Sequence, residues 1–358
     1  MHIPIPFSYE MGGTLMTMEE MARIIGISRI TLSKVMNNKD GVSEETRQRV
    51  KEYIERYNFE PNSQARSLVG KKEQIIGFFT TYSEEAGGNT HVTSHFATEL
   101  VNLVVNAAQK RGYKTLVDIT PKEDDFSEVE KYLNSGLIRG AILFGYASGS
   151  PNLEYLSRKG VPLVLINQEV TLDLPNISLV NMDDETWGYQ AIECLVKLNH
   201  RRLLYLTCSR RRLPVKRRAH GVKRALEAYK DQILSFQECN GEFNEDLSYE
   251  IVKKIYTQER EKPTGIFAAN DQMAIGAINA LKDLGIRVPE EVSVIGFDDI
   301  SISKYLTPAL TTIHCDFKEI ADRSVEALID SIEGKVEKSH QELPLEFVKR
   351  ESLAFHKE

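Results

Sequence analysis

Residues 17–36 read TMEEMARIIGISRITLSKVM, and this stretch decides the fold of the N-terminal part of the chain. Thr17 and Glu20 have the spacing of a capping box, in which a hydroxyl and a carboxylate bind the free N–H groups at the start of a helix. Apolar residues then recur at helical spacing until Gly26, which favours the left-handed conformation that ends a helix. Ser28 is a typical N-cap of a second helix. The stretch therefore predicts two short helices joined by a tight turn.

A third helix would complete this module. Ala22 is small enough to let two helices cross closely, and Leu32 and Val35 on the second helix would pack back against the first. Ser43 is the expected N-cap of a third helix at 44–57, whose apolar residues close a three-helix core. An ordinary helical hairpin is the alternative, but the spacing of the small residue, the glycine and the leucine favours a helix-turn-helix.

In a helix-turn-helix, the N-terminal part of the second helix enters the major groove of DNA. Arg29 and Lys34 can donate hydrogen bonds to guanine, and Ile30 can contact a thymine methyl group. Helix N-caps such as Ser28 and Ser43 favour phosphate oxygens. The candidate DNA-binding residues of this module are Thr17, Ser28, Arg29, Ile30, Thr31, Ser33, Lys34, Asn37 and Ser43.

The net charge of -7 argues at first against nucleic acid, because proteins that bind phosphate backbones are usually basic. The charge is unevenly spread, however. Residues 17–72 carry 11 Lys or Arg against 8 Asp or Glu, whereas residues 73–358 carry 34 against 43. The N-terminal segment therefore has an excess of three positive charges, and the negative charge belongs to the rest of the chain, as expected when a small module binds DNA.

Further motifs follow at long intervals. The third expected helix includes VSEETRQRV at 42–50, residues 57–68 read YNFEPNSQARSL, residues 267–277 read FAANDQMAIGA, and residues 292–299 read VSVIGFDD. In this order, and with the helix-turn-helix, they resemble the lactose/galactose repressor family of bacterial transcription regulators over residues 17–352. The resemblance implies a small all-α helix-turn-helix headpiece with a hinge helix, joined to a two-lobed α/β, periplasmic-binding-protein-like core with parallel sheets.

The resemblance also implies a role for the segment that follows the headpiece. Residues 61–74 would form the hinge helix and linker, with Asn62 at the helix start and Ala65 beside Leu68. Leu68 would be inserted into the minor groove, where an apolar wedge between base steps bends DNA. Lys34 stands where the family commonly has arginine. Because lysine lacks the two-pronged guanidinium, we expect a different operator preference.

From residue 75 onward, apolar runs alternate with helical stretches. The expected strands are 75–80, 115–119, 140–144, 162–167, 203–207, 265–269 and 292–297, and the expected helices include 96–111, 185–198, 218–229 and 272–284. This alternation predicts parallel sheets with helices on both faces. About a dozen strands are too many for one small sheet, so residues 75–358 are predicted to form two lobes with a ligand cleft between them.

Polar residues follow several of these strands, where ligands of open α/β sheets gather. They are Asn167, the pair at 270–271 and the pair at 298–299. Both pairs could instead cap the helical segments that follow. The resemblance implies that Asn270 and Asp298 contact an effector.

The resemblance adds Arg218 and Phe243 to this site. An amide, a carboxylate and a guanidinium can bind hydroxyl groups, while an aromatic ring covers the apolar face of a sugar. Val222 stands where the family usually has an aromatic residue, so that wall of the site is expected to differ. The candidate effector-binding residues are Asn167, Arg218, Phe243, Asn270 and Asp298.

Residues 209–218, SRRRLPVKRR, carry six basic side chains in ten residues. The plain interpretation is a solvated, charged loop. The sharper hypothesis is that this run attracts an anionic effector, such as a sugar phosphate or a sugar acid.

Other classes of function find little support. The sequence has no dinucleotide-binding or Walker glycine pattern, no nucleophile elbow and no HExxH pair, so no enzyme, metal or cofactor is expected. The four cysteines show no disulfide or zinc spacing. No stretch is long and apolar enough for a membrane span. Residues 1–16 are interpreted as a tail, or as sequence upstream of the true start, rather than as a signal peptide.

The sequence thus predicts a cytoplasmic, nucleoid-associated, homodimeric repressor. It would bind a pseudo-palindromic double-stranded DNA operator under the control of a small-molecule effector. The expected boundaries are a tail at 1–16, the headpiece at 17–60, the hinge and linker at 61–74, and the effector-binding and dimerisation domain at 75–358.

Overall fold

The computed structural model describes residues 18–36, 39–57, 73–81, 83–84, 91–92, 95–120, 125–146, 151–170, 174–208 and 212–357. The chain divides into two compact units, Met1–Glu73 and Gln74–Glu358. Within the described ranges, no helix is long and apolar enough to cross a membrane.

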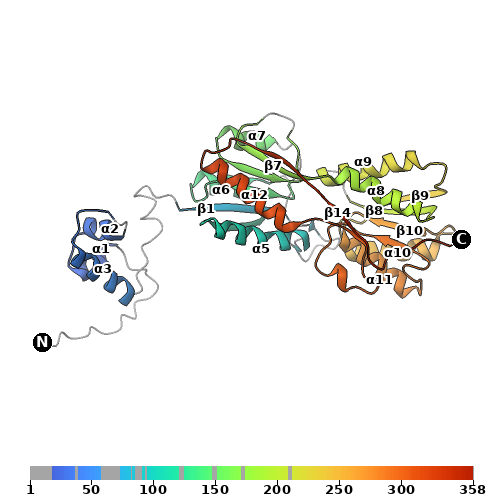
Figure 1. Ribbon diagram of the computed structural model, residues 1–358, viewed down its shortest axis with the longest axis horizontal. Coiled ribbons are helices and arrows are strands. Elements are labelled where there is room, and N and C mark those ends of the chain that lie inside the picture. The colour runs from blue at the N-terminus through green and yellow to red at the C-terminus, as the bar shows by residue number, and fades with distance from the viewer. Residues whose placement is uncertain are drawn as a thin grey trace. The chain divides into compact units, whose positions relative to one another are not determined.

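The first unit contains the three predicted helices, α1 (Met18–Ile25), α2 (Arg29–Met36) and α3 (Glu44–Arg56) (Figure 1). Gly26 ends α1 with a φ of +76°, as its position predicted. The third helix ends at Arg56, one residue before the expected Tyr57. The buried residues of the three helices form one apolar core, which consists of Met21, Ala22, Ile25, Leu32, Val35 and Val50. The prediction of a three-helix headpiece core is confirmed.

The first lobe of the second unit is a six-stranded sheet in which every pairing is parallel. Its strands, in spatial order, are β13 (His340–Leu343), β7 (Ile177–Met182), β6 (Leu163–Ile166), β5 (Ala141–Phe144), β1 (Ile75–Thr81) and β4 (Lys114–Thr120). Helices α5 (His95–Lys110) and α12 (Phe317–Ile332) pack together on one face, and the buried residues of α6 (Ser127–Asn134) and α7 (Pro151–Arg158) belong to a separate core on the other. Two short strands, β2 (Ser83–Glu84) and β3 (His91–Val92), pair outside this sheet.

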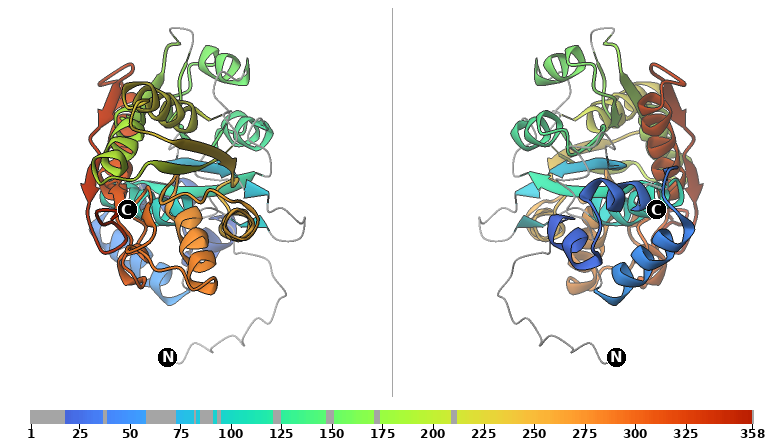
Figure 2. Two further views of the ribbon diagram at one scale, coloured as in Figure 1. Left: turned by 90° about the vertical axis from the view of Figure 1, so that its right-hand side faces the viewer. Right: turned by 90° about the vertical axis from the view of Figure 1, so that its left-hand side faces the viewer.

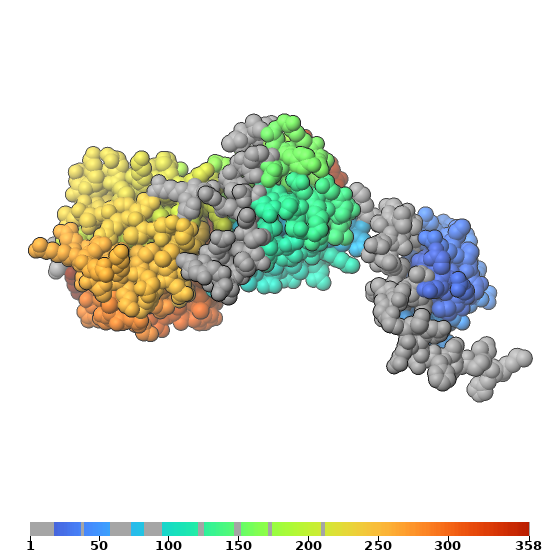
Figure 3. Space-filling view, turned by 180° about the vertical axis from the view of Figure 1, so that it is seen from behind, coloured from blue at the N-terminus to red at the C-terminus, as the bar shows by residue number. Residues whose placement is uncertain are grey.

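The second lobe is a smaller parallel sheet. Its strands, in spatial order, are β11 (Ser293–Ile295), β10 (Gly265–Ala268), β8 (Arg202–Thr207) and β9 (Ser235–Asn240). Helices α8 (Asp184–Lys197) and α9 (Leu213–Ala228) pack against each other on one side, and α10 (Glu245–Gln258) and α11 (Asp271–Asp283) pack on the other (Figures 1 and 2). Figure 3 shows the two lobes as neighbouring masses of the second unit.

Three passages of the chain connect the lobes. The first leads from β7 into α8, the second from β12 (Thr312–His314) into α12, and the third from β13 into β14 (Glu346–Val348). Strands β12 and β14 pair with each other in antiparallel fashion. A short 3-10 helix, η1 (Ser303–Tyr305), precedes β12. The predicted two-lobed α/β architecture with parallel sheets is confirmed.

The start of one helix was predicted five residues too late. The helix expected to begin at Arg218 begins at Leu213, with Pro214 in its first turn. The described part of the basic run is therefore the N-terminal part of α9 rather than a loop. Proline is favoured in the first helical turn because its missing N–H has no helical partner there.

Candidate DNA-reading helix and effector cavity

The N-caps of α2 and α3 form as expected. The Ser28 hydroxyl accepts a hydrogen bond from the Thr31 backbone N–H at 3.0 Å, and the Ser43 hydroxyl accepts one from the Thr46 N–H at 3.3 Å. Both serines are exposed. Their capping role is confirmed, whereas contact with DNA phosphate stays a prediction.

The exposed face of α2 has the chemistry of a base-reading surface. Ile30 is 71% exposed, although nothing in the headpiece core requires an apolar side chain there. Arg29 is also exposed and lies 2.8 Å from Glu19, so its guanidinium is held at the start of the helix. Thr31, Ser33 and Lys34 are half-buried on the same helix. The remaining predicted DNA-binding residues lie outside the described residues, namely Thr17, Asn37, Asn62, Ala65 and Leu68.

All five predicted effector-binding residues line one cavity in the second unit. Side chains of both lobes line this cavity, whose volume is about 70 Å³. The cavity is therefore narrow. Its lining consists of Phe96, Phe144, Gly145, Tyr146, Ile166, Asn167, Arg212, Pro214, Arg218, Phe243, Asn270 and Asp298.

Arg218 is the most constrained polar group in this lining. Its Nε lies 2.8 Å from the Asp184 Oδ1, and one of its amino groups donates a hydrogen bond to the Ala269 carbonyl. The guanidinium carbon lies 3.4 Å from the centre of the Phe297 ring. Burial alone would lower the pKa of Arg218, but the carboxylates of Asp184 and Asp298 raise it above its ordinary value. The side chain is thus a fixed cation that can donate hydrogen bonds.

Asp298 lies beside this arginine, with 3.9 Å between its Oδ1 and the arginine Nη2. Its backbone has a φ of +107° and is held by hydrogen bonds to Ile313 and from Cys315. Burial raises the pKa of its carboxyl well above the usual range, and the charge of Arg218 opposes this shift. A carboxyl in this setting can accept a proton as well as a hydrogen bond, which suits a ligand hydroxyl.

Asn270 and Asn167 add amide groups at two strand ends. The Asn270 Oδ1 accepts a hydrogen bond from the Met273 N–H at 3.0 Å, so the alternative interpretation of this residue as the N-cap of α11 is confirmed. The cap uses the oxygen and leaves the amide nitrogen as a donor. Asn167 has a φ of +54° and is 8% exposed, and its buried Oδ1 has no hydrogen-bond partner among the described residues. A buried acceptor of this kind is costly unless a ligand or water donates to it.

Asp271, the second residue of the 270–271 pair, holds the surrounding backbone and side chains in place and does not line the cavity. Asp271 accepts hydrogen bonds from the Ser303 and Thr312 hydroxyls, each at 2.6 Å, and from the Ile300 N–H at 3.0 Å. Burial raises its pKa to about 7, while these hydrogen bonds oppose the shift. A Cβ at Gly296 would lie 2.2 Å from this carboxylate, so only glycine fits beside it.

The aromatic part of the lining comes mainly from the first lobe. Phe96 and Phe144 stack with their ring centres 5.0 Å apart, and the Tyr146 hydroxyl lies 3.2 Å from the Thr120 hydroxyl. Phe243 of the second lobe was predicted from the sequence, whereas these three aromatic residues were missed. Phe144 and Tyr146 lie at the end of a correctly expected strand, so a search for aromatic as well as polar residues at strand ends would have found them.

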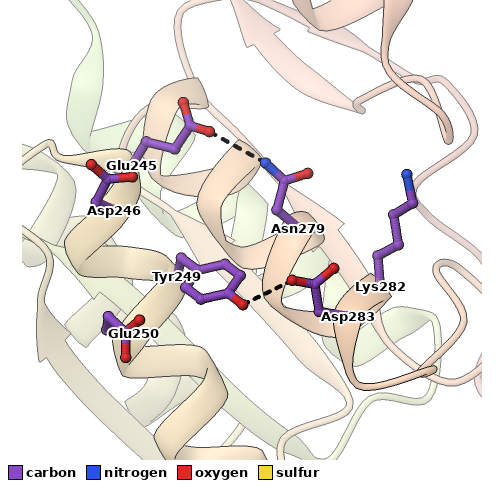
Figure 4. Close-up of a pocket in the computed structure, with 7 residues that line it drawn as sticks. All are labelled: Glu245, Asp246, Tyr249, Glu250, Asn279, Lys282 and Asp283. Atoms are coloured by element: carbon purple, nitrogen blue, oxygen red, sulfur yellow. Dashed lines mark hydrogen bonds between the residues drawn. The ribbon is translucent and has the colours of Figure 1, made fainter.

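A second hollow lies on the surface of the second lobe, between α10 and α11 (Figure 4). It has a volume of about 500 Å³ and is lined by Glu245, Asp246, Tyr249, Glu250, Asn279, Lys282 and Asp283. The Asn279 amide donates to Glu245 at 3.2 Å, and the Tyr249 hydroxyl donates to Asp283 at 2.8 Å. These side chains bind one another across the groove and leave no apolar wall for a small molecule, so the cavity between the lobes is the better ligand site.

Comparisons with known proteins match both parts of the chain. Residues 17–62 match the family model described as bacterial regulatory proteins, lacI family, and residues 192–353 match the model of a periplasmic binding protein-like domain. The HTH-type transcriptional repressor PurR of Aliivibrio fischeri (strain MJ11) is 30% identical over 325 residues, which cover 89% of this chain and 92% of the relative.

Solved structures show the same architecture. A lac repressor dimer bound to operator and the anti-inducer ONPF is similar, with a TM-score of 0.81 and 24% identity over 95% of this chain and 100% of that one. A LacI family regulator from Enterococcus faecium with bound ribose has a TM-score of 0.67 and 26% identity over 79% of this chain and 100% of that one. The chain belongs to the lacI family of bacterial regulatory proteins, as a DNA-binding transcriptional repressor, not an enzyme, that is controlled through a periplasmic-binding-protein-like effector domain.

Proposed function

We propose that the protein is a homodimeric cytoplasmic repressor, associated with the nucleoid, whose affinity for a pseudo-palindromic operator changes when a sugar or sugar derivative occupies the cavity between its lobes. The observation that carries this proposal is that five side chains, predicted from strand ends and from the family resemblance, line one narrow cavity. A ligand that contacts both lobes would favour one arrangement of them over another. Such differential affinity is what allows a small molecule to shift a conformational equilibrium.

The cavity chemistry favours a hydroxylated ring. Arg218 and the Asn270 amide offer donors, the unpaired Asn167 oxygen offers an acceptor, and the Asp298 carboxyl can do either. The aromatic side chains on the other part of the lining can cover the apolar face of a ring. One similar structure carries ribose, which supports a ligand of this class.

A negative group on the ligand fits one part of the same lining. Arg212 lies at the N-cap of α9 and lines the cavity, and a helix N-terminus adds positive potential close to it. Arg212 carries its positive charge at this helix N-terminus, where a ligand carboxylate or phosphate would meet both the guanidinium and the helix dipole. We therefore prefer a sugar acid or sugar phosphate to a neutral sugar.

Calorimetry tests this preference. Glucose, glucose 6-phosphate and glucuronate would be titrated into the full chain and into its Arg212→Gln variant. We expect tighter binding of an anionic sugar than of glucose, and loss of that difference in the variant. Equal affinities, or a preference for glucose, would contradict the anionic effector and leave the repressor assignment unaffected.

The surface supports the proposed homodimer. The outer face of α5 carries an uncharged stripe at helical spacing, with Val105 37% exposed; its members are Thr98, Asn102, Val105 and Gln109. In the second lobe, Ile302 and Tyr305 are 47% and 74% exposed around η1. Exposed apolar groups and charge-free patches mark surfaces that bind other proteins. A dimer would place two headpieces on two half-sites, and this matters because each headpiece has only a small excess of positive charge.

Two parts of the proposal concern a segment of which residues 61–72 lie outside the described residues. We propose that the linker at 61–74 forms a hinge helix and that Leu68 is inserted into the minor groove, supported by the resemblance of YNFEPNSQARSL to the family motif. Leu68→Ala should then weaken binding to the operator more than binding to unrelated DNA. A gel shift at several salt concentrations measures both affinities, and an equal loss would contradict the wedge.

A further inference from the structure

The basic residues at the start of α9 do not share one environment. Arg218 points into the cavity and is fixed by Asp184, as described above. Lys216 and Arg217, one turn or less away, make their ion pairs with residues of the other lobe. The described part of the 209–218 run is thus neither a solvated loop nor solely part of the ligand site.

Each contact joins the second lobe to the first. The Lys216 Nζ lies 3.3 Å from the Glu169 Oε1, and Glu169 follows strand β6 of the first lobe. The Arg217 Nη1 lies 3.0 Å from the Glu342 Oε1 on strand β13, and 3.4 Å from the Met182 carbonyl at the end of β7.

The first-lobe partners of Arg217 lie next to the passages that connect the two lobes, so movement between the lobes would change these contacts. Met182 is the last residue of β7, from which the chain passes into the second lobe, and Glu342 is one residue before the end of β13, from which it passes again. The carboxyl end of β1 adds a third point, where the Arg212 Nη2 lies 3.4 Å from the Thr81 hydroxyl. The start of α9 therefore touches the same edge of the first lobe's sheet at several strands.

Later residues of the same helix behave differently. His220 and Arg224 both pair with Glu185 on α8, at 2.9 and 2.8 Å, within the second lobe. Among the described residues, the ion pairs from α9 to the first lobe come from the turns that also carry the cavity residue Arg218.

We propose that Lys216 and Arg217 form an interlobe tie that favours the closed arrangement of the lobes and couples it to the position of Arg218. A single exposed ion pair contributes little, because the charges are solvated and their side chains must be ordered. These two pairs act from one rigid helix, however, and the same helix carries a side chain that lines the cavity. Separation of the lobes would break both pairs together.

Hydrogen exchange of the full chain, measured by mass spectrometry without any ligand, tests the tie. Arg217→Glu places a negative charge opposite Glu342 and should speed amide exchange at the strand ends 166–170 and 180–184 about two- to fivefold at low ionic strength, the range that one or two exposed ion pairs allow. At about 1 M salt, where the screening length is about 3 Å, the difference from wild type should disappear. Lys216→Glu should act in the same direction.

Arg224→Glu is the matched control, because it reverses a charge on the same helix whose ion-pair partner, Glu185, lies in the same lobe. It should leave exchange at these strand ends unchanged. Combining Arg217→Glu with Glu342→Arg restores an opposite-charge pair and should return exchange to the wild-type rate. Equal effects of Arg217→Glu and Arg224→Glu, or failure of the charge swap to restore protection, would contradict the tie. Neither result depends on which effector the cavity binds.

Discussion

Arg218 illustrates how single residues serve the frame and the site at once. Its guanidinium donates hydrogen bonds to the Asp184 carboxylate and the Ala269 carbonyl. The flat face of the guanidinium stacks on the Phe297 ring. The guanidinium therefore needs no rearrangement to meet a ligand, which reduces the ordering that binding requires. Two other buried residues allow similar tests: Asn167 has a side-chain oxygen without a hydrogen-bond partner among the described residues, and His200 is held in its neutral form.

Asn167 is a group that the frame leaves unsatisfied. Its φ of +54° suits glycine, and its buried side-chain oxygen has no partner among the described residues. Asn167→Gly should therefore change the free energy of unfolding by no more than about 1 kcal/mol, since the more flexible backbone is offset by removal of the unpaired oxygen. The same change should weaken effector binding at least tenfold. Urea denaturation and calorimetry would measure the two effects, and a variant that binds normally would remove Asn167 from the site.

His200 predicts a pH dependence of stability. It is fully buried between the Thr264 hydroxyl and the Ala354 carbonyl, and burial lowers its pKa to about 4 from 6.5. The neutral form is thus favoured in the folded state, so this contribution is complete above pH 6.5 and is lost as the pH falls toward 4. Between pH 8 and pH 5 it amounts to about 2 kcal/mol.

His200→Gln removes this titration. Because other groups also titrate, Asp271 among them with the opposite sign, the relevant quantity is the difference between wild type and variant. We expect the destabilisation caused by the variant to shrink by about 2 kcal/mol from pH 8 to pH 5 in urea denaturation. A difference that stays constant with pH would contradict the low pKa.

At the level of secondary structure, the packing of α8 against α9 determines the position of the cavity residue Arg218. Gly188 on α8 faces the backbone of Arg218, and a Cβ added at Gly188 would lie 2.3 Å from the Arg218 carbonyl oxygen. Gly221 on α9 faces the Glu185 carbonyl, and a Cβ added at Gly221 would lie 2.0 Å from that oxygen. Two glycines thus allow the helices to approach closely enough for Asp184 at the start of α8 to reach the guanidinium. This close approach depends on residues 33 positions apart in the chain.

Gly188→Ala should separate the two helices at this contact. Overpacking a buried contact costs about 1–3 kcal/mol, and the backbone that must shift is that of Arg218 itself. We expect a lower free energy of unfolding together with weaker effector binding. Lys223→Ala, on the exposed side of α9, should change neither. If Gly188→Ala lowers stability but leaves effector affinity intact, the helix contact does not position the arginine.

The sequence predicted local elements better than distant contacts. The headpiece helices were found because caps, Gly26 and apolar spacing are all local signals. Strands β9 and β13, SFQECN and HQEL, were missed because they are half-exposed and lack an apolar run. The start of α9 was missed because the six basic residues of the 209–218 run surround the Leu213–Pro214 signal. The polar residues of the cavity were predicted from strand ends and from the family resemblance. The ion pair between Arg218 and Asp184 was not predicted, because it depends on the packing of α8 against α9.

At the scale of the whole molecule, the uneven charge has a physical use. The acidic body discourages non-specific adhesion to DNA and leaves contact to the small basic headpiece. With so small a positive excess, tight binding is expected to need two headpieces acting together.

Val105→Glu tests the dimer. A charge in the uncharged stripe of α5 would be buried without a partner in the proposed interface, which is strongly unfavourable. Sedimentation should show a shift from dimer to monomer, and operator affinity should fall at least tenfold. Lys110→Glu at the end of the same helix is the control and should leave the dimer intact. A Val105→Glu protein that remains dimeric would place the interface elsewhere.

We expect ligand binding in the cavity between the lobes to control the affinity for DNA. Fluorescence anisotropy with an operator selected by the protein from random DNA tests it, with glucose, glucose 6-phosphate and glucuronate as probes, for wild type and Asp298→Asn. We expect at least one probe to change wild-type operator affinity tenfold or more, while Asp298→Asn binds the operator normally and does not respond. An equal response of wild type and variant, or no response of wild type to any of these sugars, would contradict it.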